Sequence, residues 1–414
     1  MAGGNMAQAK DADIVIGGGG MVGLALALAL ARGGLRVVVA DPVPPAKTVD
    51  AAFDGRVSAI SYSSVRMLEV LGVWPAIRDR AQPIHDILVT DARLDRTPSP
   101  FSLHFDHREI GAPMGFIAEN RDIRAALLDC IAGSNAISLE SPASVVELKT
   151  DGEQVRIVLN TGRELRATLF LAAEGRESPS REQMEIGLIS WAYPQRGIVA
   201  TVEHEKPHSG VAYEHFLPSG PFAILPMTGN RSSLVWTERE DLADGIMQLP
   251  AAEFEAEVAR RFGAHLGAVR AGGPRWSYPL RFHLARSYVR PRFALVGDAA
   301  HGIHPIAGQG LNLGFKDVAA LAEVVLEAAR LGLDFGAIDV LRRYERWRRF
   351  DSFALAAATD ALNRLFSNDI APLRLARDIG LGIVDGIGPL RRFFMRHAGG
   401  DIGKLPRLLR GEAA

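Results

Sequence analysis

The chain has 414 residues, 48% of them hydrophobic, and its 47 basic residues nearly balance its 48 acidic ones, for a net charge of −1. It can therefore bury a large core and could hold two or three domains, but it has no charge excess that would favour a nucleic-acid partner. The single cysteine, Cys130, excludes an internal disulfide, and the apolar run 21–31 is too short to span a bilayer. We expect a cytoplasmic protein.

The first predicted unit is a strand, a glycine-rich turn, a helix and a second strand over residues 13–41. The GxGxxG spacing of a dinucleotide-binding turn falls on Gly18, Gly20 and Gly23. Glycine serves there for the tight turn, for approach of the backbone to a pyrophosphate and for close helix packing. Asp41 ends the second strand, where a ribose-binding acid is expected. We interpret the extra Gly17 as simple tolerance of a small residue at a strand end.

The middle of the chain predicts many short strands. Residues 120–130 have helical periodicity with Asn120 as the N-cap, and strands are expected at 145–149, 155–159 and 164–172. Within residues 80–115 and 186–290, strand-like runs are expected at 84–90, 101–105, 197–202, 222–226 and 232–237. With a helix near 251–262, these runs predict a mostly antiparallel sheet and a substrate cleft between two domains.

A second glycine-rich segment, residues 293–317, again joins an apolar strand to a loop and a helix. Gly297 lets the backbone turn, so that Asp298 can offer a carboxylate to a sugar-like hydroxyl. Glycines let N–H groups approach a ligand at the helix start, where the dipole favours anions: Gly308, Gly310 and Gly314. Both glycine-rich segments would meet on one cofactor, so the nucleotide-binding domain must be discontinuous. The rest of the chain is predicted to be mostly helical, with a long amphipathic helix over 339–366.

Several other side chains are interpreted conservatively. His301 and His304 lack a nearby third ligand, so we assign them to a loop and predict no metal site. Three histidines in a polar segment are interpreted as solvated: His204, His208 and His215. Four aromatic residues could line an apolar cleft but are more often core: Trp191, Phe216, Phe222 and Trp236. No side chain is assigned as a catalytic base.

Three blocks together resemble the group A flavoprotein aromatic hydroxylases and, within them, the ubiquinone-biosynthesis hydroxylase family. The most specific block runs from Gly297-Asp298 through His301, Pro305, Gly308-Gln-Gly310 and Asn312 to Asp317. The stretch 53–61 with Leu71-Gly-Val-Trp74, and the tail 406–411, are similar to further parts of that family. The resemblance covers nearly the whole chain.

The resemblance implies an α/β fold with a discontinuous Rossmann-like FAD-binding domain, an inserted mostly antiparallel β-sheet substrate domain and a helical C-terminus. The expected FAD-binding domain comprises residues 1–79, 116–185 and 291–335. The expected substrate domain comprises 80–115 and 186–290, and the C-terminal helices 336–414.

The resemblance also implies which residues hold FAD. The GxGxxG glycines would bind the pyrophosphate, Asp41 the adenosine ribose and Asp298 the ribityl chain, while Arg56 would lie near the flavin side of the cleft and residues 305–312 would back the isoalloxazine ring. The full expected set is Gly18, Gly20, Met21, Val22, Gly23, Asp41, Arg56, Asn120, Gly175, Gly297, Asp298, Pro305, Gly308, Gln309, Gly310, Leu311 and Asn312.

One motif departs from the family. Its middle motif usually reads Asp-Gly, whereas this chain has Glu174-Gly175 within Ala172-Ala-Glu-Gly-Arg176. The longer side chain could serve in the aspartate's place or could cap a turn. The motif is associated with contacts to FAD and to NAD(P)H, so the substitution bears on both.

The implied activity is FAD-dependent hydroxylation of a polyprenylated phenol in ubiquinone biosynthesis, with NAD(P)H and O2 as co-substrates, through a flavin hydroperoxide. Two alternatives stay open: a flavin-dependent polyprenyl reductase and a non-catalytic prenyl-binding protein on the same scaffold. The basic, amphipathic tail 389–410 could dock on the inner face of the membrane or bury against another subunit. Other ubiquinone-pathway proteins are possible partners.

Overall fold

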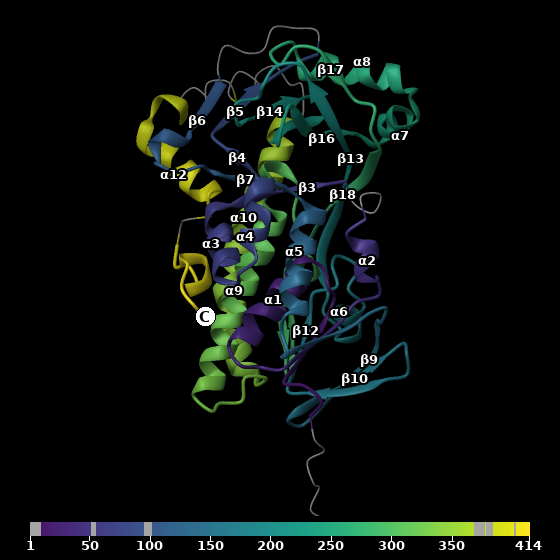
Figure 1. The fold of residues 1–414 in the computed structure, drawn as a ribbon, viewed down its shortest axis with the longest axis vertical. Helices are drawn as coiled ribbons and strands as arrows, with labels where there is room; N and C mark the ends of the chain where they lie inside the picture. Colours follow the sequence, from purple (N-terminus) through teal and green to yellow (C-terminus); the bar gives the residue numbers. More distant parts are fainter. Residues whose placement is uncertain (1–9, 51–54, 95–101, 368–376, 378–383, 401–402) are drawn as a thin grey trace, which may run out of the picture.

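The computed structural model describes residues 10–50, 55–94, 102–367, 377, 384–400 and 403–414. Of the sequence block 53–61, residues 53 and 54 lie outside the described part, as does residue 101 of the strand expected over 101–105. The fold has a layer of parallel strands with long helices at one end and a large, mostly antiparallel sheet at the other (Figure 1). The α/β fold class expected from the sequence is confirmed, while the domain boundaries stay predictions.

The nucleotide-binding layer is a six-stranded sheet. Its order is β19 (Val289–Arg290), β20 (Phe293–Leu295), β12 (Leu169–Ala172), β1 (Ile14–Gly17), β2 (Val37–Ala40) and β8 (Ile137–Glu140). All pairs are parallel except β19 with β20. Every residue of β1, β2 and β12 is buried, as expected for a parallel sheet covered on both faces. The sheet therefore joins segments from the start, middle and last third of the chain.

Three helices pack beside this sheet: α1 (Met21–Arg32), α5 (Asn120–Ala132) and α9 (Gly310–Arg330). Helix α1 contacts both α5 and α9, and its run of Leu and Ala residues is buried from Leu24 to Leu30. A separate three-stranded sheet follows the expected strands in the middle of the chain, with β9 (Val145–Asp151), β10 (Gln154–Leu159) and β11 (Glu164–Ala167). The predicted run 164–172 divides into β11 and β12.

The second large sheet has nine strands. Their order is β21 (His301–Gly302), β18 (Arg275–Ala285), β13 (Leu188–His204), β16 (Arg231–Arg239), β15 (Gly220–Met227), β14 (Val211–Leu217), β5 (Asp86–Asp91) and β6 (Ser102–Asp106), with β17 (Val269–Arg270) beside β13. It is antiparallel except where β14 runs parallel to β5. On one face, α8 (Ala251–Phe262) packs Phe254 against Phe222 and Trp236, so these two strand aromatics are core. Helix α7 (Glu240–Gln248) precedes α8.

A small fourth sheet between the two layers was not predicted. It consists of β3 (Val57–Ser61), β7 (Gly115–Glu119) and β4 (Gln82–Ile84). The run expected as one strand over 84–90 is divided, because Ile84 pairs with Gly115 whereas Asp86–Thr90 pair with β6. Helix α3 (Tyr62–Val70) packs against β3 and β7 and contacts α4 (Trp74–Ile77), whereas α2 (Pro45–Thr48) packs on α5 and α6 (Pro179–Gln183) packs on β9.

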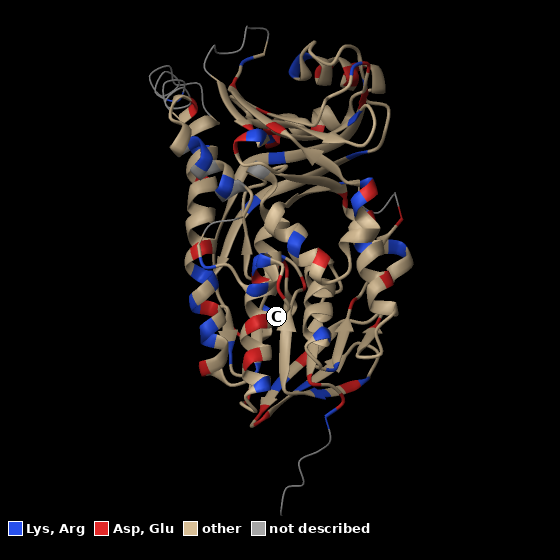
Figure 2. Cartoon of the chain, turned by 60° about the vertical axis from the view of Figure 1, so that its left-hand side comes forward, with Lys and Arg blue, Asp and Glu red and all other residues tan. Residues whose placement is uncertain are grey.

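The C-terminal part is helical, as expected, with α10 (Ile338–Phe366), α12 (Gly388–Ala398) and the 3-10 turn Arg407–Arg410. In the part of the chain that the structure describes, no helix is both long and apolar enough to cross a membrane. Basic and acidic residues alternate along the outer helices (Figure 2). The tail packs on its own chain: Met395, Leu408 and Leu409 are buried in the protein's hydrophobic clusters. Neither interpretation of the tail anticipated this.

Candidate functional site

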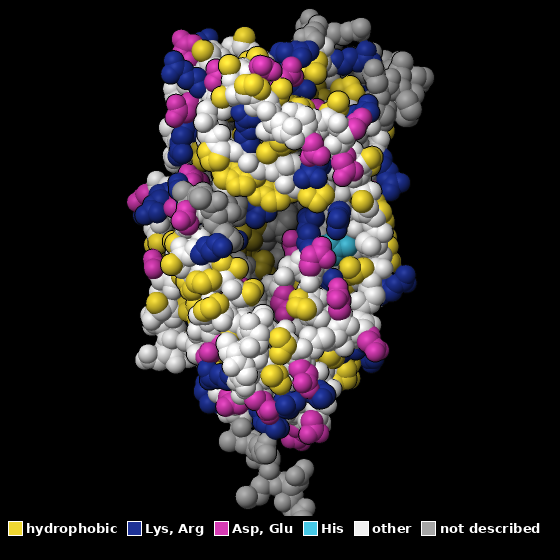
Figure 3. All heavy atoms as spheres, turned by 90° about the vertical axis from the view of Figure 1, so that its right-hand side faces the viewer, with side chains coloured by type: hydrophobic (Ala, Val, Ile, Leu, Met, Phe, Trp, Pro, Cys, Tyr) yellow, Lys and Arg dark blue, Asp and Glu magenta, His cyan; other side chains and the backbone are white. Residues whose placement is uncertain are grey.

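A single cavity of about 1620 Å³ joins the two glycine-rich segments to the antiparallel sheet. The molecule is hollowed between its two layers on the face shown in Figure 3, with hydrophobic side chains along the upper rim. Fifteen residues of the expected cofactor set line it: Gly18, Gly20, Met21, Val22, Asp41, Arg56, Asn120, Gly175, Asp298, Pro305, Gly308, Gln309, Gly310, Leu311 and Asn312. The other two, Gly23 and Gly297, lie behind this lining.

At one position of the first glycine turn, the protein backbone is open to a ligand. Gly18 has φ +101°, and an added Cβ would lie 2.3 Å from the Ala173 carbonyl oxygen. A Cβ at Gly23 would lie 2.0 Å from the Gly18 oxygen, whereas one at Gly20 would meet no protein atom within 4 Å. Gly18 and Gly23 are thus required by the fold itself. Gly20, at the start of α1, is open to the cavity, which fits a pyrophosphate cradle at a helix N-terminus.

Asp41 ties the same turn together. Its Oδ2 accepts a hydrogen bond from the Gly19 N–H at 2.5 Å, and its Oδ1 accepts one from the Val43 N–H at 2.7 Å. Since each carboxylate oxygen can accept more than one hydrogen bond, Asp41 can still accept from a ribose hydroxyl. It shapes the turn and lines the cavity at once.

Arg56 and Asn120 reach the cavity from the small sheet. The exposed Arg56 guanidinium lies 4.9 Å from the centre of the Tyr278 ring. Asn120 is buried, and its Oδ1 accepts from the Ser58 hydroxyl at 2.6 Å. The N-cap prediction for Asn120 is wrong by one residue. Glu119, still extended at the end of β7, is the N-cap, and α5 begins directly at Asn120.

Glu174 folds back onto its own loop. Its carboxylate accepts from the Ser178 hydroxyl at 2.6 Å, from the Ser180 hydroxyl at 2.8 Å and from the Ser180 N–H at 3.1 Å. This is the capped turn that was one of the two alternatives. The interpretation of Gly17 as mere tolerance is wrong, because a Cβ there would lie 2.8 Å from Phe170 Cζ and 2.9 Å from Glu174 Oε1.

A buried network fixes the second glycine turn. Asp317 is fully buried, and its carboxylate accepts from the Gly297 N–H at 3.0 Å, from His301 Nε2 at 2.6 Å and from Arg348 Nε at 2.8 Å. Burial alone would raise the pKa of Asp317, but His301 and Arg348 outweigh it and the pKa lies below its usual range. His301 is therefore a loop-fixing residue, as expected. Asp317 holds the turn that presents Asp298.

Asp298 itself faces the cavity. Its side chain is 48% exposed, and its carboxylate lies 3.5 Å from the Arg176 guanidinium. Its backbone carbonyl accepts from His283 Nε2 at 2.7 Å. A carboxylate on a rigid turn beside an open cavity is suited to bind sugar-like hydroxyls.

The loop from Pro305 to Asn312 is held from behind by its last residue. Asn312 Oδ1 accepts from the Ser61 N–H and from the Ser64 hydroxyl, both at 2.9 Å, and its Nδ2 donates to the Ala59 carbonyl at 2.8 Å. Gly310 is open, since an added Cβ would meet nothing within 4 Å. Gly314 does not serve a ligand as expected, because its Cβ position lies 2.7 Å from Val22 Cγ2 and it allows close packing on α1.

Two titratable residues that line the cavity were missed by sequence reasoning. Glu214 on β14 and Lys316 on α9 both line it, and burial raises the pKa of Glu214 to about 8 and lowers that of Lys316 to about 8. The signal for Glu214 was its alternation with Ala212 and Phe216, which also line the cavity. Phe216 is thus a cleft residue.

The histidines expected to be solvated are not. His204 Nδ1 and His208 Nε2 donate to the backbone carbonyls of Lys206 and Met227, both at 2.7 Å, and both rings are buried. His215 is half-buried, and burial lowers its pKa to about 4. The His204 and His208 rings are buried, and backbone carbonyl groups take the place of water as their hydrogen-bond acceptors.

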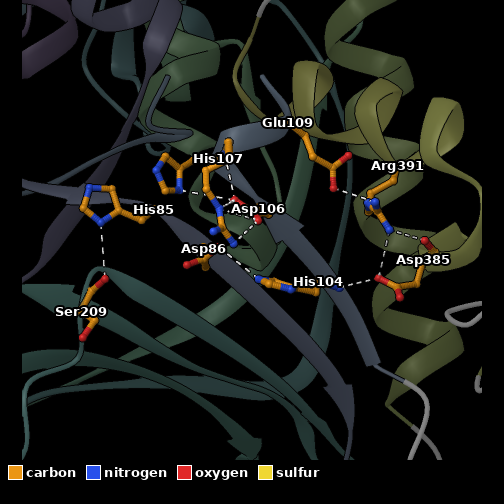
Figure 4. A network of polar contacts seen from close by, with 10 residues as sticks. His85, Asp86, His104, Asp106, His107, Glu109, Ser209, Asp385 and Arg391 are labelled. Atoms are coloured by element: carbon orange, nitrogen blue, oxygen red, sulfur yellow. Dashed lines mark hydrogen bonds and ion pairs between the residues drawn. The ribbon is translucent and has the colours of Figure 1, made fainter. Parts of the chain in front are cut away.

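A polar network outside the cavity binds α12 to the sheet edge (Figure 4). Arg391 Nη2 lies 2.6 Å from Glu109 Oε1, and Asp385 Oδ1 accepts from the His104 N–H at 3.0 Å. Ligand atoms of Asp86, Asp106 and His107 there lie within 4.8 Å of one another. However, Arg108 binds the Asp106 carboxylate at 2.6 Å and His104 binds that of Asp86 at 3.1 Å. We assign no metal to this group.

The chain is similar to known flavoproteins over almost its whole length. A family model described as an FAD binding domain matches residues 11–349. The ubiquinone hydroxylase UbiL of Rhodospirillum rubrum is 52% identical over 406 residues, covering 97% of this chain and 93% of that protein. The 3-demethoxyubiquinol 3-hydroxylase of Escherichia coli is 36% identical over 394 residues, covering 94% and 98%.

Solved structures show the same fold at low identity. The p-nitrophenol 4-monooxygenase PnpA of Pseudomonas putida matches with a TM-score of 0.78 at 20% identity, covering 95% of this chain and 98% of that one.

Proposed function

The chain belongs to the FAD binding domain family and, within it, to the ubiquinone-biosynthesis hydroxylases among the group A flavoprotein monooxygenases, and on that basis we propose that it hydroxylates the aromatic ring of a polyprenylated phenol with NAD(P)H and O2. One observation carries this proposal: a single cavity of about 1620 Å³ extends from both glycine turns to an apolar sheet face. Small-molecule sites usually measure about 300–1,000 Å³, so this cavity has room for a cofactor and a substrate together.

The cofactor fits the residues at the glycine-rich end. We propose that the backbone at Gly20 and Gly310, where an added Cβ would meet no protein atom, approaches the pyrophosphate and the flavin. Asp41 and Asp298 would accept from the ribose and ribityl hydroxyls. The loop from Pro305 to Asn312 would back the ring system. Bound FAD supplies the redox chemistry with O2. Arg176, which reaches the cavity beside Asp298, is the proposed contact for the phosphates of NAD(P)H.

The rest of the cavity supports an apolar substrate. Its walls include side chains from the antiparallel sheet, such as Phe105, Val199 and Leu280, and from α10, such as Leu362 and Phe366. These side chains would hold a prenyl chain and keep water from the ring, and the protein's contribution is then placement and dryness.

The test is oxygen incorporation. Purified protein should show the two visible absorption bands of oxidised flavin, and a short-chain 2-prenylphenol should stimulate both NAD(P)H oxidation and O2 uptake, with a product heavier by one oxygen atom. Cells that lack the protein should accumulate an under-hydroxylated prenylphenol. A flavin-dependent reductase would instead consume no O2 and add hydrogen to the chain. A yellow protein with that behaviour would refute the hydroxylase.

We also propose peripheral contact with the inner face of the membrane, through α12. Ile387 is 47% exposed just before this helix, and Arg392 and Arg396 are exposed within it. Such a surface can bind anionic lipid. Deleting the tail would be a poor test, since Leu408 and Leu409 are core residues.

Reversing the charge of the exposed arginines is a better test than deleting the tail. Arg392→Glu combined with Arg396→Glu should weaken sedimentation with phosphatidylglycerol vesicles and leave FAD content unchanged. Arg270→Glu, at an exposed site on β17, is the matched control. Equal vesicle binding by all three proteins would remove the membrane proposal and leave the hydroxylase proposal intact.

A further inference from the structure

We propose that Glu214 is the hydrogen-bonding partner of the ring hydroxyl of the aromatic substrate, an assignment that rests on the proposed function. The carboxyl stands in a row of apolar side chains across the large sheet. On β14, Glu214 faces Val89 of β5 on one side and Ala223 of β15 on the other. The row continues through Leu103, Val235 and Val199, and every member lines the cavity.

The chain itself offers this carboxyl nothing to bind. Within the described residues, Glu214 has no hydrogen-bond or ion-pair partner. Acids on the neighbouring strand do: Asp91 accepts from Arg377 Nη2 at 2.8 Å, and Asp86 from His104 Nε2 at 3.1 Å. An unpartnered carboxyl in an apolar wall costs stability. A ligand that supplies the missing hydrogen bond would recover part of that cost.

Burial sets the protonation state. It raises the pKa of Glu214 to about 8, with no charged neighbour contributing. The ionisable groups around this part of β14 are the Arg377 and Asp91 pair, the chain neighbours Tyr213 and His215, and His265 against the Tyr213 ring. Lys316 of α9 also lines the cavity, but its charged neighbours are Arg348, Asp351 and Asp317. At neutral pH the carboxyl is therefore mostly protonated, and it offers one O–H donor and one carbonyl acceptor.

The carboxyl lies beside the loop proposed to back the flavin. Ile306 of that loop packs in one hydrophobic cluster with Leu103, Phe216 and Phe366, and Val89 packs against it. Leu103 and Val89 are in the Glu214 row, and Phe216 is the next residue of β14 on the same face. A ring held by its hydroxyl at Glu214 would therefore lie at the flavin end, with its chain along Phe216 and Phe366. The hydrogen bond would then orient the ring and so determine which ring carbon faces the flavin.

The test compares a phenol with its methyl ether. Binding of 2-prenylphenol and of its O-methyl ether to the FAD-loaded protein is followed by the change in flavin absorbance. A phenol can donate to Glu214, whereas the ether can only accept. We expect the wild type to prefer the phenol by roughly 3–10-fold, the usual worth of one hydrogen bond. Glu214→Leu should abolish the preference while FAD stays bound.

The pH profile separates this role from a structural one. Between pH 6.5 and 9, the wild-type preference for the phenol should grow, because the neutral carboxyl can donate to the ether oxygen and the carboxylate cannot. Glu214→Gln should bind both ligands with no such change. Glu203→Gln, at an exposed position on β13, should behave as wild type.

Two results would overturn the assignment: a wild-type preference retained in Glu214→Leu, or a pH-dependent preference retained in Glu214→Gln. If wild-type protein hydroxylates the phenol and the Glu214 variants match it, only this assignment fails. If FAD-loaded wild type binds neither ligand, the proposed function fails with it.

Discussion

The carboxylate of Glu174 occupies the space that a side chain at Gly17 would need. A Cβ at Gly17 would lie 2.9 Å from Glu174 Oε1, closer than Cβ contacts in proteins come. Both residues depart from what their motifs lead one to expect, an apolar residue at the end of β1 and an aspartate in the middle motif. The two departures are therefore one feature: the missing side chain makes room for the longer acid, which then caps its loop through Ser178 and Ser180.

Gly17→Ala should lower the free energy of unfolding by about 1–3 kcal/mol, the usual cost of overpacking. In a Glu174→Asp background the loss should be smaller by about 0.5 kcal/mol or more, because the shorter acid withdraws from Gly17. The contact with Phe170 Cζ at 2.8 Å remains in both, so relief is partial. Urea denaturation of the four proteins measures the coupling. Strictly additive losses would mean that the two positions are independent.

Gly20→Ala and Gly310→Ala should each lower FAD affinity at least about tenfold, since a methyl group would intrude on close backbone contacts with the ligand. Neither should destabilise the apoprotein, because the added Cβ meets no protein atom within 4 Å. Fluorescence titration of apoprotein with FAD gives the affinity, and thermal unfolding gives the stability. Gly245→Ala, in the exposed helix α7 and equally open, is the control and should bind FAD normally. Unchanged FAD affinity at Gly20 would contradict the proposed pyrophosphate site.

Asp317→Asn should lower the free energy of unfolding by about 3–5 kcal/mol, because it removes the only buried carboxylate that the structure's described residues place against the buried Arg348. Asp351→Asn is the control: Asp351 also binds Arg348, at 3.0 Å, but is 57% exposed, so its loss should be under about 1 kcal/mol. Chemical denaturation at pH 7 compares them. The Asp317 variant should also bind FAD more weakly, since one amide oxygen cannot accept from Gly297, His301 and Arg348 together and the turn loosens.

The pH dependence of that loss has a definite sign. The folded-state pKa of Asp317 lies below its usual value, so the carboxylate stabilises the fold above the unfolded pKa of about 4. This stability is lost as the pH falls through the folded pKa. The difference between wild type and Asp317→Asn should therefore be largest above pH 5 and shrink in acid. A constant difference down to pH 3 would contradict the ionised assignment.

Glu214 should make wild-type stability fall with rising pH, the opposite sign to the effect of Asp317, and Glu214→Gln should remove this dependence. The folded pKa of about 8 lies above the unfolded value of about 4.3, so the native state binds more protons between them. Wild-type stability should fall as the pH rises across that window and level off above it. We expect the variant to gain on the order of 4 kcal/mol relative to wild type between pH 5 and 9, since each pH unit within the window is worth about 1.4 kcal/mol. Melting temperatures at pH 5, 7 and 9 measure this. Parallel curves would mean that Glu214 is ionised throughout.

The sequence by itself determined the elements whose signals are local. The GxGxxG turn, the run into Gly297-Asp298 and the periodic helices α8 and α10 depend on glycine conformation and apolar spacing within one segment, and all were predicted close to their observed bounds. Residues of both glycine segments could therefore be assigned to one cofactor site before any contact was known. Twelve of them line the cavity, although their cofactor contacts stay predictions.

Only the tertiary structure decided the features that depend on neighbours distant in sequence. Gly17 looked dispensable because Glu174 and Phe170, which it contacts, are far away in sequence. Gly314 looked like a ligand position because its neighbour Val22 is also far away in sequence. Glu214 carried no motif, and its meaning arises from cross-strand register with Val89 and Ala223. His204 contacts the Ser232 hydroxyl of β16, and His208 contacts the Met227 carbonyl of β15. In each case, residues from other segments determine the free-energy cost of burying the polar group or of adding a side chain at the glycine.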